Sequence, residues 1–568
     1  MSRRAIKGFS AASGQLGEEC VELGGGRLTT ARSVRGAVAR GVATAVALGL
    51  LSMGGGSIAV AAPEGTLINA AESKAHDEAL KLLNAGADAK AKDVDGTTAL
   101  HWAAHYNDAE LADKLIRAGA DVNAVNDYGS TPMMEAAVIG SPDVIKVLLK
   151  AGADVESTNK EGQTALMAVA RTGNVEAATL LIKKGAKVNA VEQWGGQSAL
   201  HWAAAQSQPD MVQLLIKHGA DVNARGVVRD WQRRVTAEGR PKNMNRGGFT
   251  PLLYAAREGC IDCARILLKS KADINLPDPD GMTPLNLAIT NMRFDFAAVL
   301  IEAGADVNKW DFFGRTPLYS AIDLNTLPRG GRPDLPSTDH LSGYDVAELL
   351  LKKGANPNVQ LKLRPPYRNG VYDRGGDQVI STGATPLLVA AKSGDAKSIS
   401  LLLKYKAIVD LPNAEGVTPL MAAAGVGHSF NPTRGRYKTD AEAVECLKLL
   451  HDAGGDVNAK VRFSGITSLH AAASLGWDDT IKALVADGAQ LEALDNKGLT
   501  PIDYAVGRHE RQFLEPEHTR KDSSVTVLKD LIVASTGRAP KEFTGTLNKQ
   551  TRGTGGAVDA VGNGNNGK

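Results

Sequence analysis

The chain has 568 residues, of which 43% are hydrophobic, 23% charged and 5% aromatic, and its formal net charge is +2. This apolar content excludes a wholly disordered chain, and four cysteines exclude a disulfide-dense scaffold. Beyond the N-terminal region no uninterrupted apolar run of twenty residues occurs, so we expect no membrane span in the mature chain.

The N-terminal region has the order of features found in an export signal. Residues 41–52 form a short apolar stretch that follows three arginines within residues 32–40 and precedes Ala59-Val60-Ala61. A basic region, an apolar region and a small-residue site in this order are typical of a secretory signal peptide. We therefore expect residues 1–61 to be a signal peptide with cleavage near Ala61, which predicts a periplasmic or extracellular protein. Whether the signal is cleaved or retained as an anchor stays open.

Most of the remaining chain repeats with a period of 33 residues. A marker glycine in the pattern Gly-x-(Thr/Ser)-(Pro/Ala/Ser) recurs along it, and six of the ten intervals between successive marker glycines are 33 residues. The other intervals are 33 residues plus an insertion. The marker glycines are Gly96, Gly129, Gly162, Gly196, Gly248, Gly281, Gly314, Gly383, Gly416, Gly465 and Gly498.

The repeating unit resembles the ankyrin repeat. Thr250-Pro251-Leu252 and Thr283-Pro284-Leu285 are close to the T-P-L-H-x-A motif of that family, and Leu100-His101-Trp102-Ala103 supplies its histidine form. The resemblance implies an all-α ankyrin-repeat solenoid over residues 62–535, with about 11–12 repeats including caps. It also implies a protein that binds one or more other proteins through its concave face and hairpin tips, without catalysis and without a cofactor.

Each unit predicts two helices and a connecting loop. Thr-Pro is a favourable helix start, because the first helical turn does not need the N–H that proline lacks. A glycine such as Gly140 ends the first helix, and apolar residues three and four apart, as in Val144, Val147 and Leu148, mark the second. One such unit cannot bury its apolar face alone, so the units should stack.

Four insertions interrupt the period, at about residues 225–246, 324–343, 360–382 and 427–440, which we call insertions one to four. Insertions one, three and four are basic, whereas the rest of the mature chain is acidic. We favour solvated loops, or loops folded back onto the acidic array, over basic fingers that steer an anionic partner. The alternative function is binding of a polyanion such as a cell-envelope polysaccharide, and nucleic acid is disfavoured. Residues 536–568 should form a disordered tail.

Cys260-Ile261-Asp262-Cys263 is a C-x-x-C motif at the start of a predicted second helix, where a thiol can be activated. Cys263 nevertheless occupies a position that is apolar in other repeats, such as Val144. We therefore favour a small core residue over a local disulfide or a thiol redox role, which remains an alternative function. Cys446 has the same interpretation.

His101 and His105 are four residues apart on one helix, but no third ligand accompanies them, so we expect no metal site. The ankyrin resemblance instead implies that His101, His201 and His470 form hydrogen bonds to the backbone of a neighbouring loop. It also places Trp102 and Trp202 towards the core between helices.

In the ankyrin family, partners contact the hairpin tips, which flank the marker glycines. Ordinary tips are polar, yet four consecutive repeats here carry large apolar residues that should align into one exposed stripe beside insertion one. The alternative is that these aromatics cover the bases of the insertions. The predicted partner-binding residues are Tyr128, Trp194, Trp231, Phe249, Met282, Trp310, Phe312, Phe313 and Arg315.

Overall fold

The computed structural model describes residues 65–230, 246–325, 339–363, 379–428, 438–508 and 520–540, and the backbone of 234–235 and 242–243. These residues belong to one compact unit that begins at Pro63. The predicted signal peptide, Trp231, parts of all four insertions and the tail beyond residue 540 lie outside the described residues.

The described residues contain twenty-four helices, which follow one another as twelve pairs. In chain order they are α1 (Leu67–Glu72), α2 (His76–Asn84), α3 (Ala99–His105), α4 (Ala109–Arg117), α5 (Pro132–Ile139), α6 (Pro142–Lys150), α7 (Ala165–Thr172), α8 (Val175–Lys183), α9 (Ala199–Ala205), α10 (Pro209–Lys217), α11 (Pro251–Glu258), α12 (Ile261–Lys269), α13 (Pro284–Thr290), α14 (Phe294–Glu302), α15 (Pro317–Asn325), α16 (Gly343–Lys352), α17 (Pro386–Ser393), α18 (Ala396–Lys404), α19 (Pro419–Ala423), α20 (Asp440–Asp452), α21 (Ser468–Leu475), α22 (Asp478–Ala486), α23 (Pro501–Val506) and α24 (Asp522–Thr536). Within insertion one, β1 (Arg234–Val235) pairs antiparallel with β2 (Lys242–Asn243), a short hairpin that the all-α prediction did not include.

The local signals of the repeat act as the sequence predicts, and α5 shows how. The Thr131 side chain accepts a hydrogen bond from the backbone N–H of Met134 (3.2 Å), and Pro132 occupies the first helical position. Gly140 ends the helix with a φ of 75°, a conformation that costs glycine little. Short helices with both ends fixed in this way account for the 33-residue unit.

Stacking supplies the stability that a single pair of helices lacks. Each first helix packs against its own second helix and against the first helices of the neighbouring pairs. Small residues such as Ala103 and Ala104 lie fully buried at these contacts and let the helices approach closely, while Leu100 fills the space between them. The buried side chains form one continuous hydrophobic core along the array. The fold is therefore an all-α repeat solenoid.

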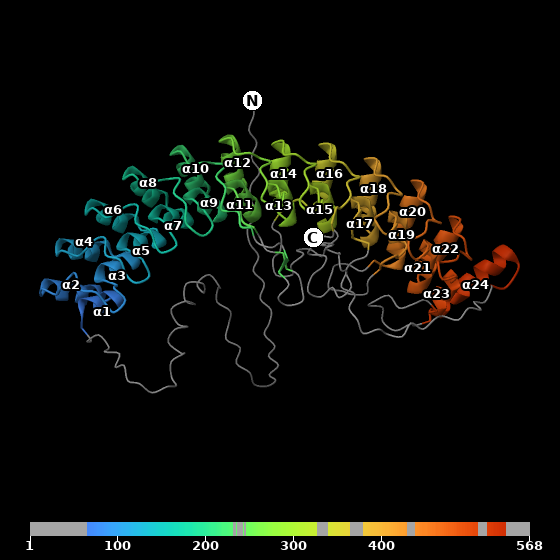
Figure 1. Ribbon diagram of the computed structural model, residues 1–568, viewed down its shortest axis with the longest axis horizontal. Coiled ribbons are helices and arrows are strands. Elements are labelled where there is room, and N and C mark those ends of the chain that lie inside the picture. The colour runs from blue at the N-terminus through green and yellow to red at the C-terminus, as the bar shows by residue number, and fades with distance from the viewer. Residues whose placement is uncertain are drawn as a thin grey trace, which may run out of the picture. The chain divides into compact units, whose positions relative to one another are not determined.

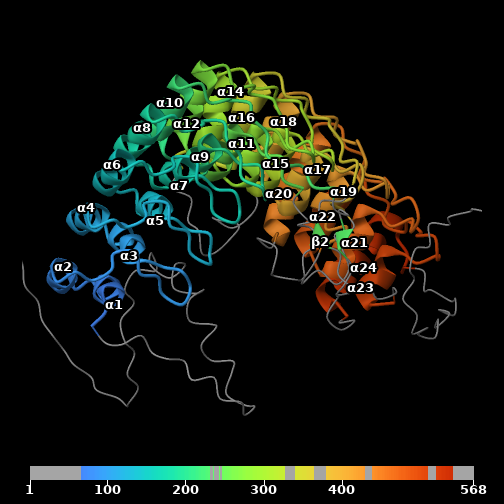
Figure 2. The same ribbon diagram turned by 60° about the vertical axis from the view of Figure 1, so that its left-hand side comes forward.

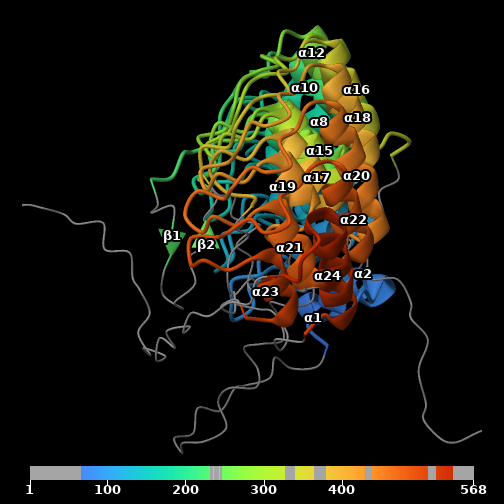
Figure 3. The same ribbon diagram turned by 90° about the vertical axis from the view of Figure 1, so that its right-hand side faces the viewer.

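The array has three layers, which the figures separate. Figure 1 shows the helix pairs side by side in chain order, with the first helices (α3, α5, α7 and so on) on the inner side of the curve, and Figure 2 shows the same order from a second direction. Viewed along the stack in Figure 3, the second helices, the first helices and the long loops follow one another from right to left. The loop tips therefore form a row beside the inner helices.

The insertions leave this array at two kinds of position. Insertions one and three lie in loops between pairs, before α11 and α17, whereas insertions two and four separate the two helices of one pair, before α16 and α20. A further long connection separates α23 from α24, and the spacing of the marker glycines does not predict it. None of the helices in the described residues is long and apolar enough to cross a membrane.

Candidate functional site

Polar side chains close the loop tips and hold them in fixed conformations. In one tip, Asn126 Oδ1 accepts hydrogen bonds from the backbone N–H groups of Tyr128 (3.1 Å) and Ser130 (2.9 Å). In a later tip the buried carboxylate of Glu192 accepts a hydrogen bond from the N–H of Trp194 (2.6 Å). These bonds form within each tip, so a side chain carried on a tip has a defined position.

Backbone hydrogen bonds also join successive tips into a row. The N–H of Phe312 donates to the carbonyl oxygen of Asp280 in the preceding tip (2.8 Å). The N–H of Lys362 donates in turn to the carbonyl oxygen of Phe313 (2.9 Å). A partner that contacts several tips would therefore meet a surface that is ordered before binding, which lowers the entropy lost on association.

The first apolar cluster on this row is the Trp194 cluster, formed by Val191, Trp194, Val227, Val228 and Arg229. The indole of Trp194 is 65% exposed, and the three valines are exposed as well. The Arg229 guanidinium carbon lies 5.0 Å from the centroid of the indole ring, and the guanidinium also donates to the Trp194 carbonyl oxygen. The base of insertion one thus places a cation over an exposed aromatic face.

The second is the Trp310 cluster, formed by Trp310, Phe312, Phe313, Lys362 and Leu363. Trp310 is 54% exposed, and Lys362 Nζ lies 3.9 Å from its ring centroid. The rings of Phe312 and Phe313 meet edge to face with centroids 5.2 Å apart. Insertion three leaves the array here, so both clusters combine a tip aromatic with a cation from the start of an insertion. The alternative that tip aromatics contact the insertions is therefore correct in part.

The marker glycine separates outward from inward positions, which corrects part of the predicted site. These glycines have positive φ, for example 70° at Gly248 and 84° at Gly314, and so reverse the chain. The residue that follows turns inward: Phe249 is 6% exposed and Arg315 is 5% exposed, and Met282 is partly buried against the core. The expectation that Phe249 and Arg315 are exposed at the tips is wrong, and Met282 is only partly exposed.

The prediction of one continuous exposed apolar stripe across four repeats is therefore also wrong. The ring of Phe249 packs against Tyr254 inside the array, with centroids 5.3 Å apart. Among the residues that the structure describes, the tips between the Trp194 and Trp310 clusters therefore present no exposed aromatic. Tyr128 lies exposed on a separate tip, and Trp231 is outside the described residues.

Two further apolar residues are exposed on the tips but are not among the predicted partner-binding residues, although Phe463 stands at a position where the marker glycines predict a tip. Val94 is 94% exposed, and Phe463 is exposed on a late tip with the Arg462 guanidinium carbon 5.4 Å from its ring centroid. Both stand two residues before a marker glycine, as Trp194 and Phe312 do. That position in the repeat is the signal that would have found them.

Several basic residues of the insertions contact the array, and one contacts insertion one itself. Arg225 donates to the carbonyl oxygen of Pro277 (2.7 Å), and Arg246 donates to that of Arg229 (3.3 Å). Lys438, counted with insertion four as a basic finger, is instead buried, donates to the Ala422 carbonyl oxygen (2.6 Å), and has a pKa that burial lowers to about 7. Arg225 and Lys438 therefore fold back onto the array, as the favoured interpretation expects, whereas Arg246 contacts insertion one itself.

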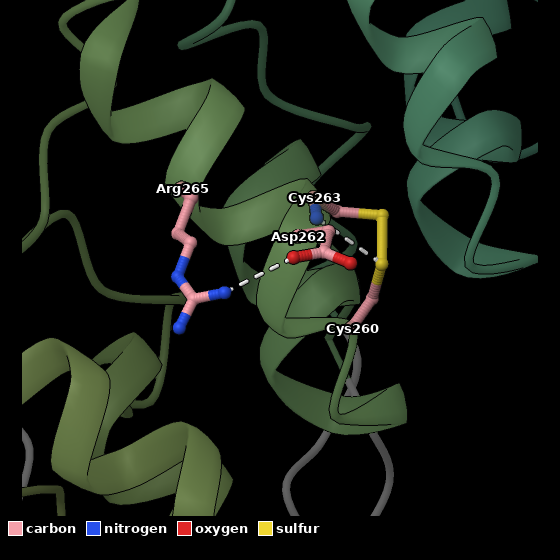
Figure 4. Close-up of a disulfide and its surroundings, with 4 residues drawn as sticks. All are labelled: Cys260, Asp262, Cys263 and Arg265. Atoms are coloured by element: carbon pink, nitrogen blue, oxygen red, sulfur yellow. Dashed lines mark hydrogen bonds and ion pairs between the residues drawn. A yellow bond between two sulfur atoms is a disulfide. The ribbon is translucent and has the colours of Figure 1, made fainter. Parts of the chain in front are cut away.

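The two cysteines of the C-x-x-C motif are joined by a disulfide, as Figure 4 shows. The preference for a plain core residue was therefore wrong for the pair, although Cys263 is completely buried as expected. One helical turn brings the first and fourth residues of this motif within bonding distance, which the comparison with Val144 could not indicate. Cys446 is buried in α20.

The histidines of the repeat motif have the predicted framework role. The Nε2 atoms of His101, His201 and His470 each lie 3.1 Å from a backbone carbonyl oxygen of the following loop. Trp102 and Trp202 are partly buried against the core. In the ranges that the structure describes, no group of three or more His, Cys, Asp and Glu side chains could hold a metal ion.

One tip carries a carboxylate where other tips carry an amide. Replacing this carboxylate by an amide should stabilise the fold. Asp278 accepts hydrogen bonds from the N–H groups of Asp280 (2.9 Å) and Met282 (2.8 Å), but burial raises its pKa to about 6. Because the pKa in the folded state exceeds the ordinary aspartate value of 3.8, the charged carboxylate lowers stability fully above pH 6, and this cost disappears as the pH falls towards 3.8. We expect Asp278→Asn, which copies Asn126, to stabilise the array by about 2 kcal/mol at pH 7 after allowance for partial exposure.

Unfolding measured at pH 7 and pH 4 checks this expectation. The gain should vanish at pH 4, and the exposed Asp273→Asn should show no comparable pH dependence. An equal gain at both pH values would contradict the assignment to the buried charge.

Comparison with known proteins agrees with this architecture. A family model for ankyrin repeats in three copies matches residues 67–159, 140–226, 342–430 and 438–515, and one for ankyrin repeats in many copies matches residues 252–301. The solved human ASB11 ankyrin repeat domain aligns with 43% of this chain and 99% of its own length, at 22% identity and a TM-score of 0.36.

Curated relatives match over segments of the array. The chain is 33% identical over 168 residues to the Nuclear factor NF-kappa-B p105 subunit of Gallus gallus, covering 29% of this chain and 14% of that protein. It is 34% identical over 125 residues to the human Ankyrin repeat and KH domain-containing protein 1, and this match covers 22% of this chain and 4% of that protein. The chain thus spans a small part of the length of these relatives. Since the three-copy model matches more than half of the residues, the chain belongs to the ankyrin repeat family.

Proposed function

We propose that this protein is a non-catalytic scaffold that binds other proteins through its loop tips, with the Trp194 and Trp310 clusters as the main contacts. Ankyrin repeats typically mediate protein–protein interactions, and the family models that match the chain describe ankyrin repeats. The observation that carries the proposal is the pair of exposed indoles, each with a cation over its ring. Exposed aromatics with arginine or lysine beside them are typical centres of protein interfaces.

The chemistry of the clusters indicates what a partner would present. The indole faces and the neighbouring valine, leucine and phenylalanine side chains favour burial of apolar groups. Arg229 and Lys362 place positive charge beside the two indoles, and this charge favours a partner that carries carboxylates near its apolar groups. We infer a partner segment that combines apolar and acidic residues, bound across several tips on the concave side.

We further propose that the protein acts in the periplasm or outside the cell, after the signal peptide is removed near Ala61. The support is the order of basic, apolar and small residues within residues 1–61, together with the disulfide between Cys260 and Cys263. Disulfides persist in oxidising compartments and are rare in the cytosol. Fractionation of cells with N-terminal sequencing of the mature chain tests this location.

The binding proposal predicts a large loss of affinity when the clusters are truncated. The variant Trp194→Ala/Trp310→Ala/Phe312→Ala should bind a captured partner at least about 30-fold more weakly, because truncation of one central interface aromatic alone typically costs about 2 kcal/mol or more. The measurement is capture from an envelope extract, followed by titration of each purified partner against both proteins. Val533→Ala on α24, an exposed apolar residue away from the tips, is the matched control and should leave the Kd unchanged.

Two outcomes would count against this function. Equal affinity of the triple variant and the wild type would remove the tip clusters from the interface. Tight binding of an anionic polysaccharide with a steep dependence on salt would instead favour the polyanion alternative.

A further inference from the structure

The disulfide occupies a helix start at which other repeats place a capping side chain. Cys260 is the N-cap residue of α12, and its Sγ accepts a hydrogen bond from the backbone N–H of Cys263 (3.3 Å). In α4 and α6 the equivalent residues Asp108 and Ser141 accept the corresponding N–H through side-chain oxygen. The sulfur of Cys260 therefore lies where the repeat provides a ready hydrogen-bond donor.

This placement favours the thiolate of Cys260 once the bond is reduced. A sulfur anion at the N-cap would be stabilised by the same N–H and by the positive end of the helix dipole, as the carboxylate of Asp108 is at the start of α4. The nine-residue helix α12 is long enough to present this dipole. The repeat thus supplies the electrostatic setting that dithiol sites require.

The two sulfurs differ in access. Cys260 is half-buried, whereas Cys263 is completely buried in the core. We expect an incoming thiol to reach Cys260 more readily than Cys263, because Cys260 is the more exposed residue of the two. In Figure 4 the disulfide lies on one side of α12, and the ion pair between Asp262 and Arg265 (3.2 Å) lies on another.

The charges next to the pair do not oppose an anionic sulfur. The carboxylate of Asp262 alone would disfavour an anionic sulfur, but Arg265 pairs with it. An acidic residue at this second helical position also recurs in other repeats, for example Asp143 in α6. The side chain of Arg293 lies beside Gly259, directly before Cys260. Arg293 Nε donates to the carbonyl oxygen of Arg257 (3.4 Å), and a positive charge beside the segment that precedes α12 would favour a thiolate at Cys260.

We propose that Cys260 and Cys263 form a thiol–disulfide exchange site, in which Cys260 is the sulfur that exchanges with dithiols and disulfides of other molecules. A thiolate of a dithiol attacks Cys260 Sγ, the bond between the two cysteines breaks, and the Cys263 sulfur leaves and takes up a proton. The second sulfur of the dithiol, as a thiolate, then attacks the dithiol sulfur that is bonded to Cys260. This step closes the disulfide of the dithiol and releases Cys260 as a thiolate. The dithiol is oxidised to a disulfide by two electrons, and the cysteine pair gains them. This activity does not depend on the proposed partner binding.

The test follows reduction of the folded full-length chain. Dithiothreitol is added at pH 7 without denaturant, free thiols are labelled at intervals, and peptide mapping separates the pair from Cys446 and Cys20 while circular dichroism reports helix content. We expect the pair to be reduced with unchanged helix content, before Cys446 becomes labelled. If the pair stays oxidised until the helices unfold, it is a structural crosslink and the proposal fails.

Single variants test which sulfur exchanges. Cys263→Ala leaves Cys260 and copies Ala177 of α8, and Cys260→Ser leaves Cys263 and copies Ser141, so both substitutions use residues that the repeat already accepts. With an aromatic disulfide probe at pH 7, Cys260 should react at least ten-fold faster than Cys263, and its rate should be half-maximal below about pH 7.5 rather than near 8.5. Equal rates for the two cysteines would overturn the assignment of Cys260.

Discussion

Replacement of Arg315 by alanine should destabilise the middle of the array by about 3–5 kcal/mol. The guanidinium and the Asp311 carboxylate form an ion pair at 2.5 Å, and both side chains are almost completely buried. Asp311 also accepts the backbone N–H groups of Phe313 (3.0 Å) and Arg315 (2.9 Å), so its charge is built into the tip. Removal of the arginine leaves that carboxylate buried without its counter-ion.

The repeat itself provides the control and the rescue for this experiment. Arg117→Ala breaks an exposed ion pair in α4 and should cost less than about 1 kcal/mol. The double variant Asp311→Asn/Arg315→Gln copies Asn159 and Gln163 of an earlier tip, whose side chains are hydrogen-bonded at 3.2 Å, and should recover most of the loss. Hydrogen exchange over α13–α15 and thermal unfolding measure both effects. A rescue variant as unstable as Arg315→Ala would contradict the ion-pair explanation.

Acidification should weaken the array through His201, and His201→Asn should abolish that response. The backbone N–H of Ser198 donates to Nδ1 (3.1 Å), so the proton of the neutral ring is on Nε2 and is donated to the Ala224 carbonyl oxygen (3.1 Å). Burial lowers the pKa of His201 to about 4 from the ordinary histidine value of 6.5. The neutral ring is therefore the folded form, and stability that is complete above pH 6.5 is lost as the pH falls to 4, by about 3 kcal/mol.

Asparagine suits this position because Asn286 occupies it in α13. Its Nδ2 donates to the carbonyl oxygen of Lys309 (3.0 Å) in the following loop, which is the hydrogen bond that the histidine makes, without a titrating group. Hydrogen exchange over α9 and α10 between pH 4 and pH 7 checks the prediction. His218→Asn, an exposed change in the same repeat, is the matched control. The hypothesis fails if His201→Asn and the wild type lose protection equally on acidification.

The regular part of the fold could be predicted because each of its signals is local. Thr131 and Pro132 start a helix and Gly140 ends it by interactions within a few residues, and the 33-residue period then predicts that the same unit recurs. The framework role of His201 was implied in the same way by its place in the motif. Stacking needs no further information, because each unit meets only its neighbours.

The binding surface was harder to predict because exposure depends on which side of the marker glycine a residue stands. Trp194 and Phe312 precede their glycines and are exposed, whereas Phe249 and Arg315 follow theirs and are buried. Hydrophobicity alone does not distinguish these residues, since aromatic side chains are common both in cores and in interfaces. The reversal of the chain at a glycine of positive φ makes the difference.

The sequence by itself determined the family, the number and kind of helical units, and the places at which insertions interrupt the period, since all of these follow from local caps and from recurrence. Only the tertiary structure decided that Cys260 and Cys263 are bonded, that Lys438 is buried, and that Trp194 and Trp310 are exposed in two separate clusters with a cation over each indole. Those outcomes depend on distances and directions between side chains from different elements, and composition and spacing along the chain do not record them.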